Sequence, residues 1–247
     1  MAIKFNISKA FDDFKAMGGK TKFPDSLKQV LKYMQSDNNL TTINEVAWLL
    51  ATAKVESDYS LQRWESDYLC GKAGVPYKNQ PCDRALRYYR SSNGKKNYFD
   101  LGTDSNGMAY FGRGLIQLTG KSNYDTYGKE IGVDLIADGD KALIPKNSYN
   151  IASSYFKRRK VFEYANAENF PMARKSVKGS SSGWEDAKNE YDLWIDVLKK
   201  KNVGFKVTNK NNKAKSVSLK SILGYSVIFI AVVGLAYGFT IVTKTNK

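Results

Sequence analysis

Two glutamates nine residues apart, Glu56 and Glu65, are the side chains best suited to acid–base chemistry in this chain. Leu49 and Ala53 precede Glu56 at helical spacing, so its carboxyl shares a helix face with apolar neighbours near the end of a predicted helix. An apolar setting favours the protonated carboxyl that an acid catalyst needs. Two carboxyl groups roughly 6.5–9.5 Å apart across a cleft would let a water attack a sugar from the face opposite the acid.

The spacing of the pair requires a turn between its members. An unbroken helix would separate the two glutamates by about 13.5 Å along its axis, which is too far for both to act on one bond. The chain must therefore turn after Glu56, and residues 57–60 (Ser-Asp-Tyr-Ser) permit this. The pair alone does not establish a site, because two glutamates at this spacing also occur as ordinary surface charges.

The residue counts restrict the chemistry further. The chain has 247 residues, with no histidine and two cysteines. Ser-His-Asp and Cys-His nucleophile pairs, His-Glu-x-x-His zinc proteases and His-ligated zinc amidases are excluded, since each needs imidazole. Catalysis must rest on carboxylates, Lys, Tyr or Ser, and the two-carboxylate mechanism needs no cofactor and no metal. Cys70 and Cys82 could close one short loop, worth on the order of 3 kcal/mol in an oxidising compartment, and their redox state stays open.

A second candidate segment runs from residue 109 to residue 124 and reads AYFGRGLIQLTGKSNY. It lacks the third glycine of a dinucleotide-binding loop, and no β-rich run precedes it, so a phosphate-binding role is disfavoured. The segment places flexible glycines beside amide, hydroxyl and aromatic side chains, which hydrogen-bond to sugars and stack on them. The candidate substrate-binding residues are Tyr110, Arg113, Gln117, Thr119, Asn123 and Tyr124.

This segment resembles the hallmark of the glycoside hydrolase family 19 chitinases and, more closely, of the phage endolysins that share their fold. The hallmark has the form Gly-Arg-Gly-x-Ile-Gln-Leu-Thr, followed shortly by Asn-Tyr, and residues 112–119 and 123–124 match it. The Glu-Ser pair at residues 56–57 also matches the end of the family's catalytic helix, although Val55 replaces the usual histidine. The resemblance covers about residues 40–195 and implies a mainly α, lysozyme-like, two-lobed helical domain.

The same resemblance implies roles for individual residues. Glu56 would be the general acid and Glu65 the general base of an inverting hydrolysis, with Thr119 holding the attacking water. Gln117 and Asn123 would bind N-acetyl sugars. The implied substrate is peptidoglycan, or a chitin-like polymer of N-acetylglucosamine, cleaved at its β-1,4 bonds by a phage or virion-associated lytic enzyme.

The sequence also departs from that family. Its members usually carry an Ile-Asn-Gly-Gly segment followed by an arginine, whereas residues 177–180 here read Val-Lys-Gly-Ser and the arginine position falls on Ala187. Lys178 thus replaces the asparagine. These changes alter one wall of the expected cleft, and they leave open an alternative: a non-catalytic cell-wall-binding or structural virion membrane protein that retains the fold.

The net charge of +15 is unevenly distributed. Residues 199–247 hold ten lysines and no acidic residue, which leaves 29 basic against 24 acidic residues, or +5, for residues 1–198. A nucleic-acid-binding role driven by the basic tail is therefore the least favoured reading. The aromatic-basic run at residues 84–90 is interpreted as a helix face, and the run at residues 155–160 as either a solvated helix end or a patch for an anionic substrate.

The sequence predicts a membrane anchor near its end. Residues 221–243 are 23 uncharged residues, which would span roughly 35 Å as a helix and cross a hydrocarbon core of about 30 Å. Eight lysines precede this span and two follow it, a bias that places the preceding domain on the cytoplasmic side. A host membrane, or the internal membrane of a virion that presents the enzyme to the wall, is the expected location. The predicted organisation is a catalytic domain (1–198), a Lys-rich linker (199–220), a transmembrane helix (221–243) and a basic tail (244–247).

Hydrophobic periodicity predicts that the first of these parts is helical almost throughout. The clearest helix begins with a capping box, Thr42-x-x-Glu45, and should run to about Glu56. Trp184 and Trp194 are interpreted as core anchors of the last helix. Further helices are expected near residues 7–17, 25–36, 82–91, 146–159 and 184–201, with loops at 18–19, 72–81 and 179–183.

Overall fold

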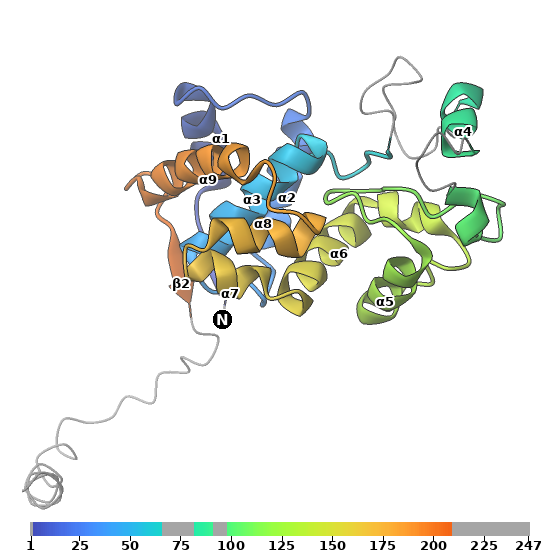
Figure 1. Ribbon diagram of the computed structural model, residues 1–247. Coiled ribbons are helices and arrows are strands. Elements are labelled where there is room, and N and C mark those ends of the chain that lie inside the picture. Colours follow the sequence, from blue (N-terminus) through green and yellow to red (C-terminus); the bar gives the residue numbers. More distant parts are fainter. Residues whose placement is uncertain (1, 66–81, 91–97, 209–247) are drawn as a thin grey trace, which may run out of the picture. The chain divides into compact units, whose positions relative to one another are not determined.

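The computed structural model describes residues 2–65, 82–90 and 98–208, and this part of the chain is mainly helical (Figure 1). In chain order the elements are β1 (Ala2–Lys4), α1 (Ile7–Ala16), α2 (Pro24–Met34), α3 (Ile43–Ser57), α4 (Asp83–Arg90), the 3-10 helix η2 (Tyr98–Leu101), α5 (Lys121–Ile131), the 3-10 helix η3 (Gly139–Leu143), α6 (Pro145–Arg158), α7 (Val161–Asn166), α8 (Phe170–Lys178), α9 (Trp184–Lys199) and β2 (Lys206–Thr208).

The chain divides into two compact units, Met1–Asn209 and Lys210–Lys247. The second unit lies outside the described residues, and so do the predicted transmembrane helix (221–243), the basic tail (244–247) and the expected loop at 72–81. Within the described ranges, no helix combines the length and the apolar character that a membrane span requires.

The helix α3 is the central element of the core. Its capping box is confirmed: the Thr42 hydroxyl accepts a hydrogen bond from the Glu45 amide (3.1 Å), and the Glu45 carboxylate accepts one from the Thr42 amide (2.9 Å). From Val46 to Ala53 every residue is fully buried. The helix packs against α9, α7 and α6.

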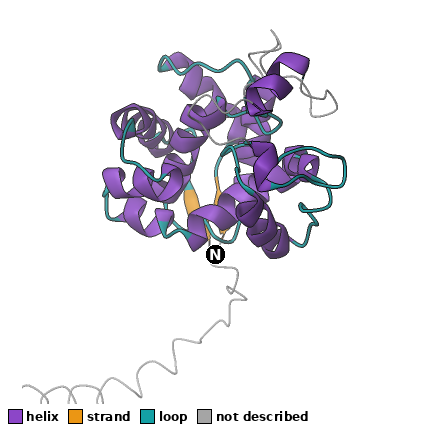
Figure 2. Ribbon diagram, turned by 45° about the vertical axis from the view of Figure 1, so that its right-hand side comes forward, coloured by secondary structure: helices purple, strands orange, loops and turns teal. Residues whose placement is uncertain are grey.

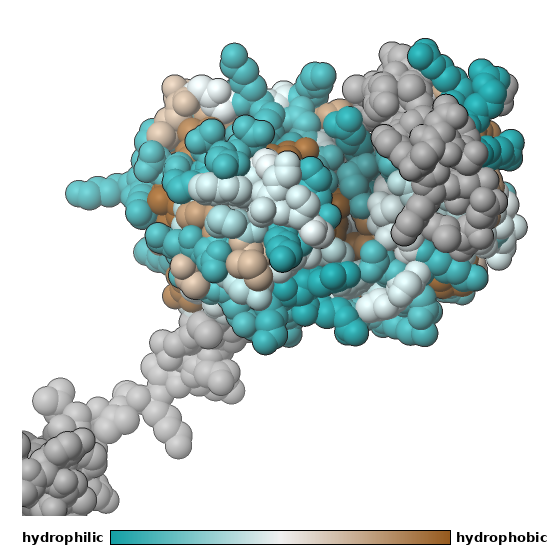
Figure 3. All heavy atoms as spheres, viewed as in Figure 1, coloured by the Kyte–Doolittle hydropathy of each residue, from teal (hydrophilic) through white to brown (hydrophobic). Residues whose placement is uncertain are grey.

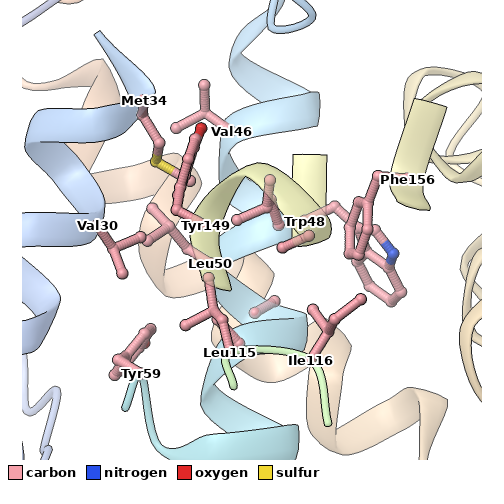
Figure 4. Packing of buried hydrophobic residues seen from close by; sticks show 14 of the residues in the cluster. Val30, Met34, Val46, Trp48, Leu50, Tyr59, Leu115, Ile116, Tyr149 and Phe156 are labelled. Carbon is pink, nitrogen blue, oxygen red and sulfur yellow. The ribbon is translucent and has the colours of Figure 1, made fainter. Parts of the chain in front are cut away.

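The core around α3 also takes side chains from the glycine-containing segment. Figure 4 shows Leu115 and Ile116 reaching the group of buried side chains that includes Trp48 and Leu50. A fully buried leucine contributes about 1.5–3 kcal/mol relative to an exposed one. The segment expected to bind sugar is thus attached by hydrophobic burial to the helix that carries Glu56 in its last turn.

The last helix supplies the expected core anchor. Trp194 is fully buried and stacks on Phe14 of α1, with ring centroids 4.7 Å apart. Trp184 is partly buried and packs against the same core. The interpretation of these two tryptophans as core residues is confirmed.

The structured part extends beyond the boundary predicted at residue 198. Strand β2 pairs with β1 in an antiparallel two-stranded sheet, with Ile3 opposite Val207 (Figure 2). Val203 is also buried, and its carbonyl accepts a hydrogen bond from the Asn6 amide (2.8 Å). The predicted linker start at 199 is therefore corrected. Strands of three residues are too short to give a periodicity signal, and this pairing joins segments about 200 residues apart.

A smaller hydrophobic cluster forms beside the main core. Cys82 packs against it and is disulfide-bonded, whereas Cys70, its predicted partner, lies outside the described residues. The buried members of the small cluster are Trp64, Ala85, Ala109, Phe111 and Leu143.

On the face seen in Figure 3, the coloured surface is mainly hydrophilic.

Candidate active site

One cavity of about 400 Å³ brings the two predicted catalytic glutamates together. Both Glu56 and Glu65 line it, although they belong to different segments of the chain. Within the described residues, no group of three acidic or cysteine side chains could hold a metal ion. The other residues that line the cavity are Ile116, Gln117, Leu118, Thr119, Asn123, Tyr155, Val177 and Lys178.

The end of α3 places Glu56 at the cavity and ties it to the glycine-containing segment. The next residue, Ser57, is fully buried, and its hydroxyl lies within hydrogen-bond distance of two carbonyl oxygens, Ala53 O (3.1 Å) and Leu115 O (2.8 Å). The contact to Leu115 joins the helix end to the segment across 58 residues of sequence. Serine at this position therefore fixes the spacing between Glu56 and the opposite part of the cavity.

The chain turns directly after α3, as the sequence predicted. Asp58 and Tyr59 both adopt the left-handed conformation, with φ of 54° and 67°. A non-glycine residue rarely adopts this conformation, so tertiary contacts must stabilise the turn. The Asp58 carboxylate accepts a hydrogen bond from the Lys22 amide (2.8 Å), and the Tyr59 hydroxyl donates to the carboxylate of Glu190 on α9. The left-handed turn ends the helix and leads the chain toward Glu65.

Backbone pairing holds Glu65 against the glycine-containing segment. The Glu65 amide donates to the Gly112 carbonyl (2.6 Å), and the Gly112 amide donates back to Glu65 Oε2 (2.9 Å). The Tyr98 hydroxyl donates to Glu65 Oε1 (3.0 Å). Donors at both oxygens stabilise the charged carboxylate, which is the form a general base requires.

Gly112 is needed for close packing at this point. A Cβ atom on Gly112 would lie 3.1 Å from Gln117 Oε1, 3.2 Å from Thr119 Oγ1 and 3.3 Å from the Cβ of Glu65. Each of these contacts is tighter than ordinary van der Waals contact. Three predicted site residues therefore converge on a position that only glycine fills without displacing them.

Gln117, Thr119 and Asn123 all line the cavity and are oriented by the backbone of the same segment. The Thr119 hydroxyl donates to the Gln117 carbonyl (2.8 Å), and Asn123 Nδ2 donates to the Thr119 carbonyl (2.7 Å). Gln117 Nε2 donates to the carbonyls of Arg63 (3.1 Å) and Gly114 (3.0 Å). The amide and hydroxyl groups are thus pre-oriented, which lowers the entropy lost when a sugar binds.

Three residues expected to bind substrate lie in the core instead. Tyr110, Arg113 and Tyr124 are 2%, 1% and 0% exposed, and none lines the cavity. Arg113 pairs with Asp140 (2.7 Å) and donates to the Tyr124 hydroxyl (2.9 Å). Burial raises the pKa of Tyr124 to about 12, so its hydroxyl stays protonated and donates to the Phe111 carbonyl (2.6 Å). The expectation that these three side chains contact sugar is corrected. Their polar groups instead form hydrogen bonds within the protein and stabilise the conformation of this segment.

The residue that sequence reasoning missed is Arg174, on α8. It is 3% exposed and forms an ion pair with Glu56, whose side chain is 20% exposed. The position of the arginine in the resembled family falls on Ala187, which is buried in α9 and does not line the cavity. In this chain the cation that contacts Glu56 comes from α8 instead. α8 has only nine residues and was not predicted, so nothing in the sequence pattern associated Arg174 with Glu56.

The remaining wall of the cavity is formed by α6 and the end of α8. The Tyr155 hydroxyl donates to the Val177 carbonyl (3.0 Å), which fixes the segment that replaces the expected Asn-containing one. Lys178 follows, is exposed, and lines the cavity. The Arg159 guanidinium lies over the Tyr155 ring, 5.2 Å from its centroid. Part of the aromatic-basic run at residues 155–160 thus belongs to the cavity wall.

Comparison with known proteins agrees with this architecture. Chitinase C from Streptomyces griseus HUT6037 superposes with a TM-score of 0.51 at 16% sequence identity, over 80% of this chain and 94% of that chain, which shows a shared fold. A chitinase C mutant gives a TM-score of 0.48 at 16% identity, over 78% of this chain and 91% of that one. No curated protein matches the sequence significantly.

A family match covers much of the site itself. Residues 69–189 match the glycoside hydrolase family 19, chitinase class I. The matched range includes the segment at residues 112–119 together with Arg174 and Lys178, and it begins four residues after Glu65. The chain is a glycoside hydrolase, and residues 69–189 are similar to the chitinase class I family.

Proposed function

We propose that this glycoside hydrolase cleaves β-1,4 bonds of peptidoglycan, or of a related N-acetylglucosamine polymer, by an inverting mechanism. The observation that carries the proposal is that Glu56 and Glu65 line the same cavity. That cavity also contains the amide and hydroxyl groups suited to N-acetyl sugars, from Gln117, Thr119 and Asn123.

In this mechanism the two carboxyl groups act on opposite faces of the sugar. Glu56 gives its proton to the glycosidic oxygen as the bond to the anomeric carbon breaks. Glu65 accepts a proton from a water, whose oxygen forms the new bond to that carbon from the other face. Thr119 helps to hold the water. The product sugar has the inverted, α configuration at the anomeric carbon, and neither a cofactor nor a covalent enzyme intermediate is needed.

The neighbours of the two glutamates suit them to different roles. The Gly112 amide and the Tyr98 hydroxyl donate to the two carboxylate oxygens of Glu65 and hold this side chain in place. As Glu56 releases its proton to the glycosidic oxygen, its developing negative charge is stabilised by Arg174, a contribution that grows toward the transition state.

The test is to replace each glutamate by glutamine. We expect Glu56→Gln and Glu65→Gln each to lower the release of reducing ends from purified cell walls by about 10²–10⁴-fold, the usual contribution of a general acid or base. Glu185→Gln, which changes an exposed glutamate on α9, is the matched control and should keep full activity. Unchanged turnover in Glu56→Gln would remove Glu56 from the mechanism.

The stereochemistry of the product gives a second, independent test. In an NMR time course on a soluble oligosaccharide, the α-anomer should appear first, before mutarotation produces the β-anomer. An initial β product would indicate a retaining mechanism and contradict the assignment of Glu65 as a base that activates water.

One observation favours a second candidate, a non-catalytic wall-binding or structural virion membrane protein. Without substrate, the ion pair with Arg174 stabilises the charged form of Glu56, whereas a general acid must be protonated. Wall binding and turnover measured on the same preparation separate the two candidates. Binding without release of reducing ends would favour the second one.

The proposed location is a membrane of the host or of a virion, anchored through residues 221–243. The 23 uncharged residues of that segment support the proposal. A lytic enzyme of a membrane-containing phage would meet the wall as the virion enters or leaves the cell. Protease protection in intact virions tests this, and a domain permanently sealed away from the wall would contradict it.

A further inference from the structure

We propose that Lys178 selects glycans that carry a carboxylate, such as a lactyl ether or a peptide carboxyl on alternate sugars, over neutral N-acetylglucosamine chains. This inference rests on the proposed hydrolysis and names the substrate class of the same site. It makes Lys178 a specificity-determining residue rather than a catalytic one.

The first argument is the position of Lys178. It is the last residue of α8, it lines the cavity, and it is exposed. Within the described part of the chain, no carboxylate lies within ion-pair distance of its amine. The other cation beside the cavity, Arg174, is already paired with Glu56. Lys178 therefore has a charge available for a ligand.

The second argument is that the backbone carrying Lys178 is fixed while its side chain can adapt. On one side, the Val177 carbonyl is held by the Tyr155 hydroxyl (3.0 Å). On the other side, Gly179 ends α8 in the left-handed conformation (φ 81°), and its amide donates to the Lys175 carbonyl (2.8 Å). A fixed attachment point with a flexible four-carbon stem suits recognition of an anionic group that is itself flexible.

The third argument is the charge balance of the cavity. A glycan carboxylate that enters beside Glu56 and Glu65 is repelled unless a cation accompanies it. Lys178 supplies that cation on the wall formed by α6 and the end of α8. A neutral chain would gain nothing from this cation. The arrangement therefore favours a substrate whose carboxylate lies on the side of Tyr155 and Lys178.

Binding and turnover should be measured separately on the full-length chain. For binding, Glu56→Gln serves as the background, and the probe is a soluble oligosaccharide of alternating N-acetylglucosamine and N-acetylmuramic acid. The same oligosaccharide with its carboxylates converted to amides, and a chitin hexamer, are the neutral ligands. Lys178→Gln removes the cation and Lys178→Arg retains it. Lys175→Gln, an exposed lysine on the same helix that does not line the cavity, is the matched control.

We expect Lys178→Gln to raise the Kd for the carboxylate-bearing oligosaccharide about fivefold, the effect of losing one partly exposed ion pair. The Kd for the amide form and for the chitin hexamer should not change. Lys178→Arg and Lys175→Gln should remain within about twofold of the background. Added salt should weaken carboxylate binding in the background but not in Lys178→Gln.

An equal loss for the acid and amide forms, or no loss at all, overturns the inference. Turnover by the wild-type chain reports separately on the proposed function. Carboxylate-selective binding without hydrolysis would refute the hydrolase proposal and leave the role of Lys178 standing. Hydrolysis of neutral and carboxylate-bearing chains at equal rates, with no effect of Lys178→Gln, would refute that role and leave the hydrolase standing.

Discussion

At the residue scale, the ion pair between Arg174 and Glu56 holds the proposed acid in place. Arg174 is almost fully buried, so its charge acts on Glu56 through a medium that screens it little. In the proposed mechanism this charge stabilises the negative charge that develops on Glu56 as it gives up its proton.

We predict that Arg174→Met lowers kcat by about 10–100-fold. Without the cation, the negative charge that develops on Glu56 during the reaction is less stabilised. The measurement is kcat on a soluble oligosaccharide, together with thermal unfolding to verify the fold. Arg158→Met, which removes an arginine paired with Glu130 away from the cavity, is the control. An unchanged kcat in a folded Arg174→Met variant would refute the proposed role of Arg174.

The sequence predicts some site residues and misses others for a physical reason. Glu56 and Glu65 could be singled out because the motif at residues 109–124 and the Glu-Ser pair at residues 56–57 resemble a known family, whereas their spacing alone does not distinguish them from surface charges. Arg113 and Tyr124 match the motif, yet they are buried beneath the site. A sequence motif includes residues that stabilise the conformation of a segment as well as residues that contact substrate. Sequence alone does not distinguish these two kinds of residue. Arg174 could not be found, since its contact with Glu56 spans 118 residues.

At the scale of elements, the long periodic helices are predictable and the short ones are not. α3 was identified from its capping box and apolar pattern, and it ends one residue after the predicted end at Glu56. α5, α7 and α8 were missed. α7 and α8 have only six and nine residues, and α5 contains Gly128, where a Cβ would lie 2.7 Å from the Val133 carbonyl oxygen. Tertiary packing rather than local propensity places these helices.

Tyr59, in the turn between α3 and Glu65, donates a hydrogen bond to a partly buried acid, Glu190, so the stability of the folded state depends on pH. Burial raises the pKa of Glu190 on α9, while the hydrogen bond from Tyr59 opposes this rise. The folded state therefore binds a proton more tightly than the unfolded state does. Stability must fall as pH rises from the ordinary glutamate range through the raised folded pKa.

We predict that Glu190→Gln weakens this pH dependence. Glutamine can still accept a hydrogen bond from the Tyr59 hydroxyl, but it brings no charge into the buried position. The melting temperature of the variant relative to wild type should therefore rise as pH increases from about 4 to 7. Thermal unfolding at several pH values checks this, with Glu185→Gln, an exposed residue of the same helix, as the control. Parallel curves for Glu190→Gln and wild type would contradict the argument.

At the scale of the whole molecule, the boundary of the folded unit follows from long-range pairing. Composition places a change at residue 198, where lysines replace the mixed charges of the domain. The β1–β2 pairing and the buried Val203 show that the folded part continues through Thr208. A chain cut at residue 198 would lose these contacts. A shortened chain that keeps the folded unit intact should therefore end at Thr208.

That end point allows the proposed membrane anchor to be tested apart from the proposed catalysis. We predict that the full-length chain sediments with anionic lipid vesicles and is released only by detergent, because residues 221–243 insert and the lysines before them contact the head groups. A chain ending at Thr208 should stay in the supernatant and hydrolyse soluble oligosaccharide with the same kcat. Release of the full-length chain by high salt alone would indicate surface attraction without insertion, and would contradict the anchor. Equal kcat values would place the chemistry entirely within residues 1–208, so that the anchor affects where the glycan is cleaved and not how.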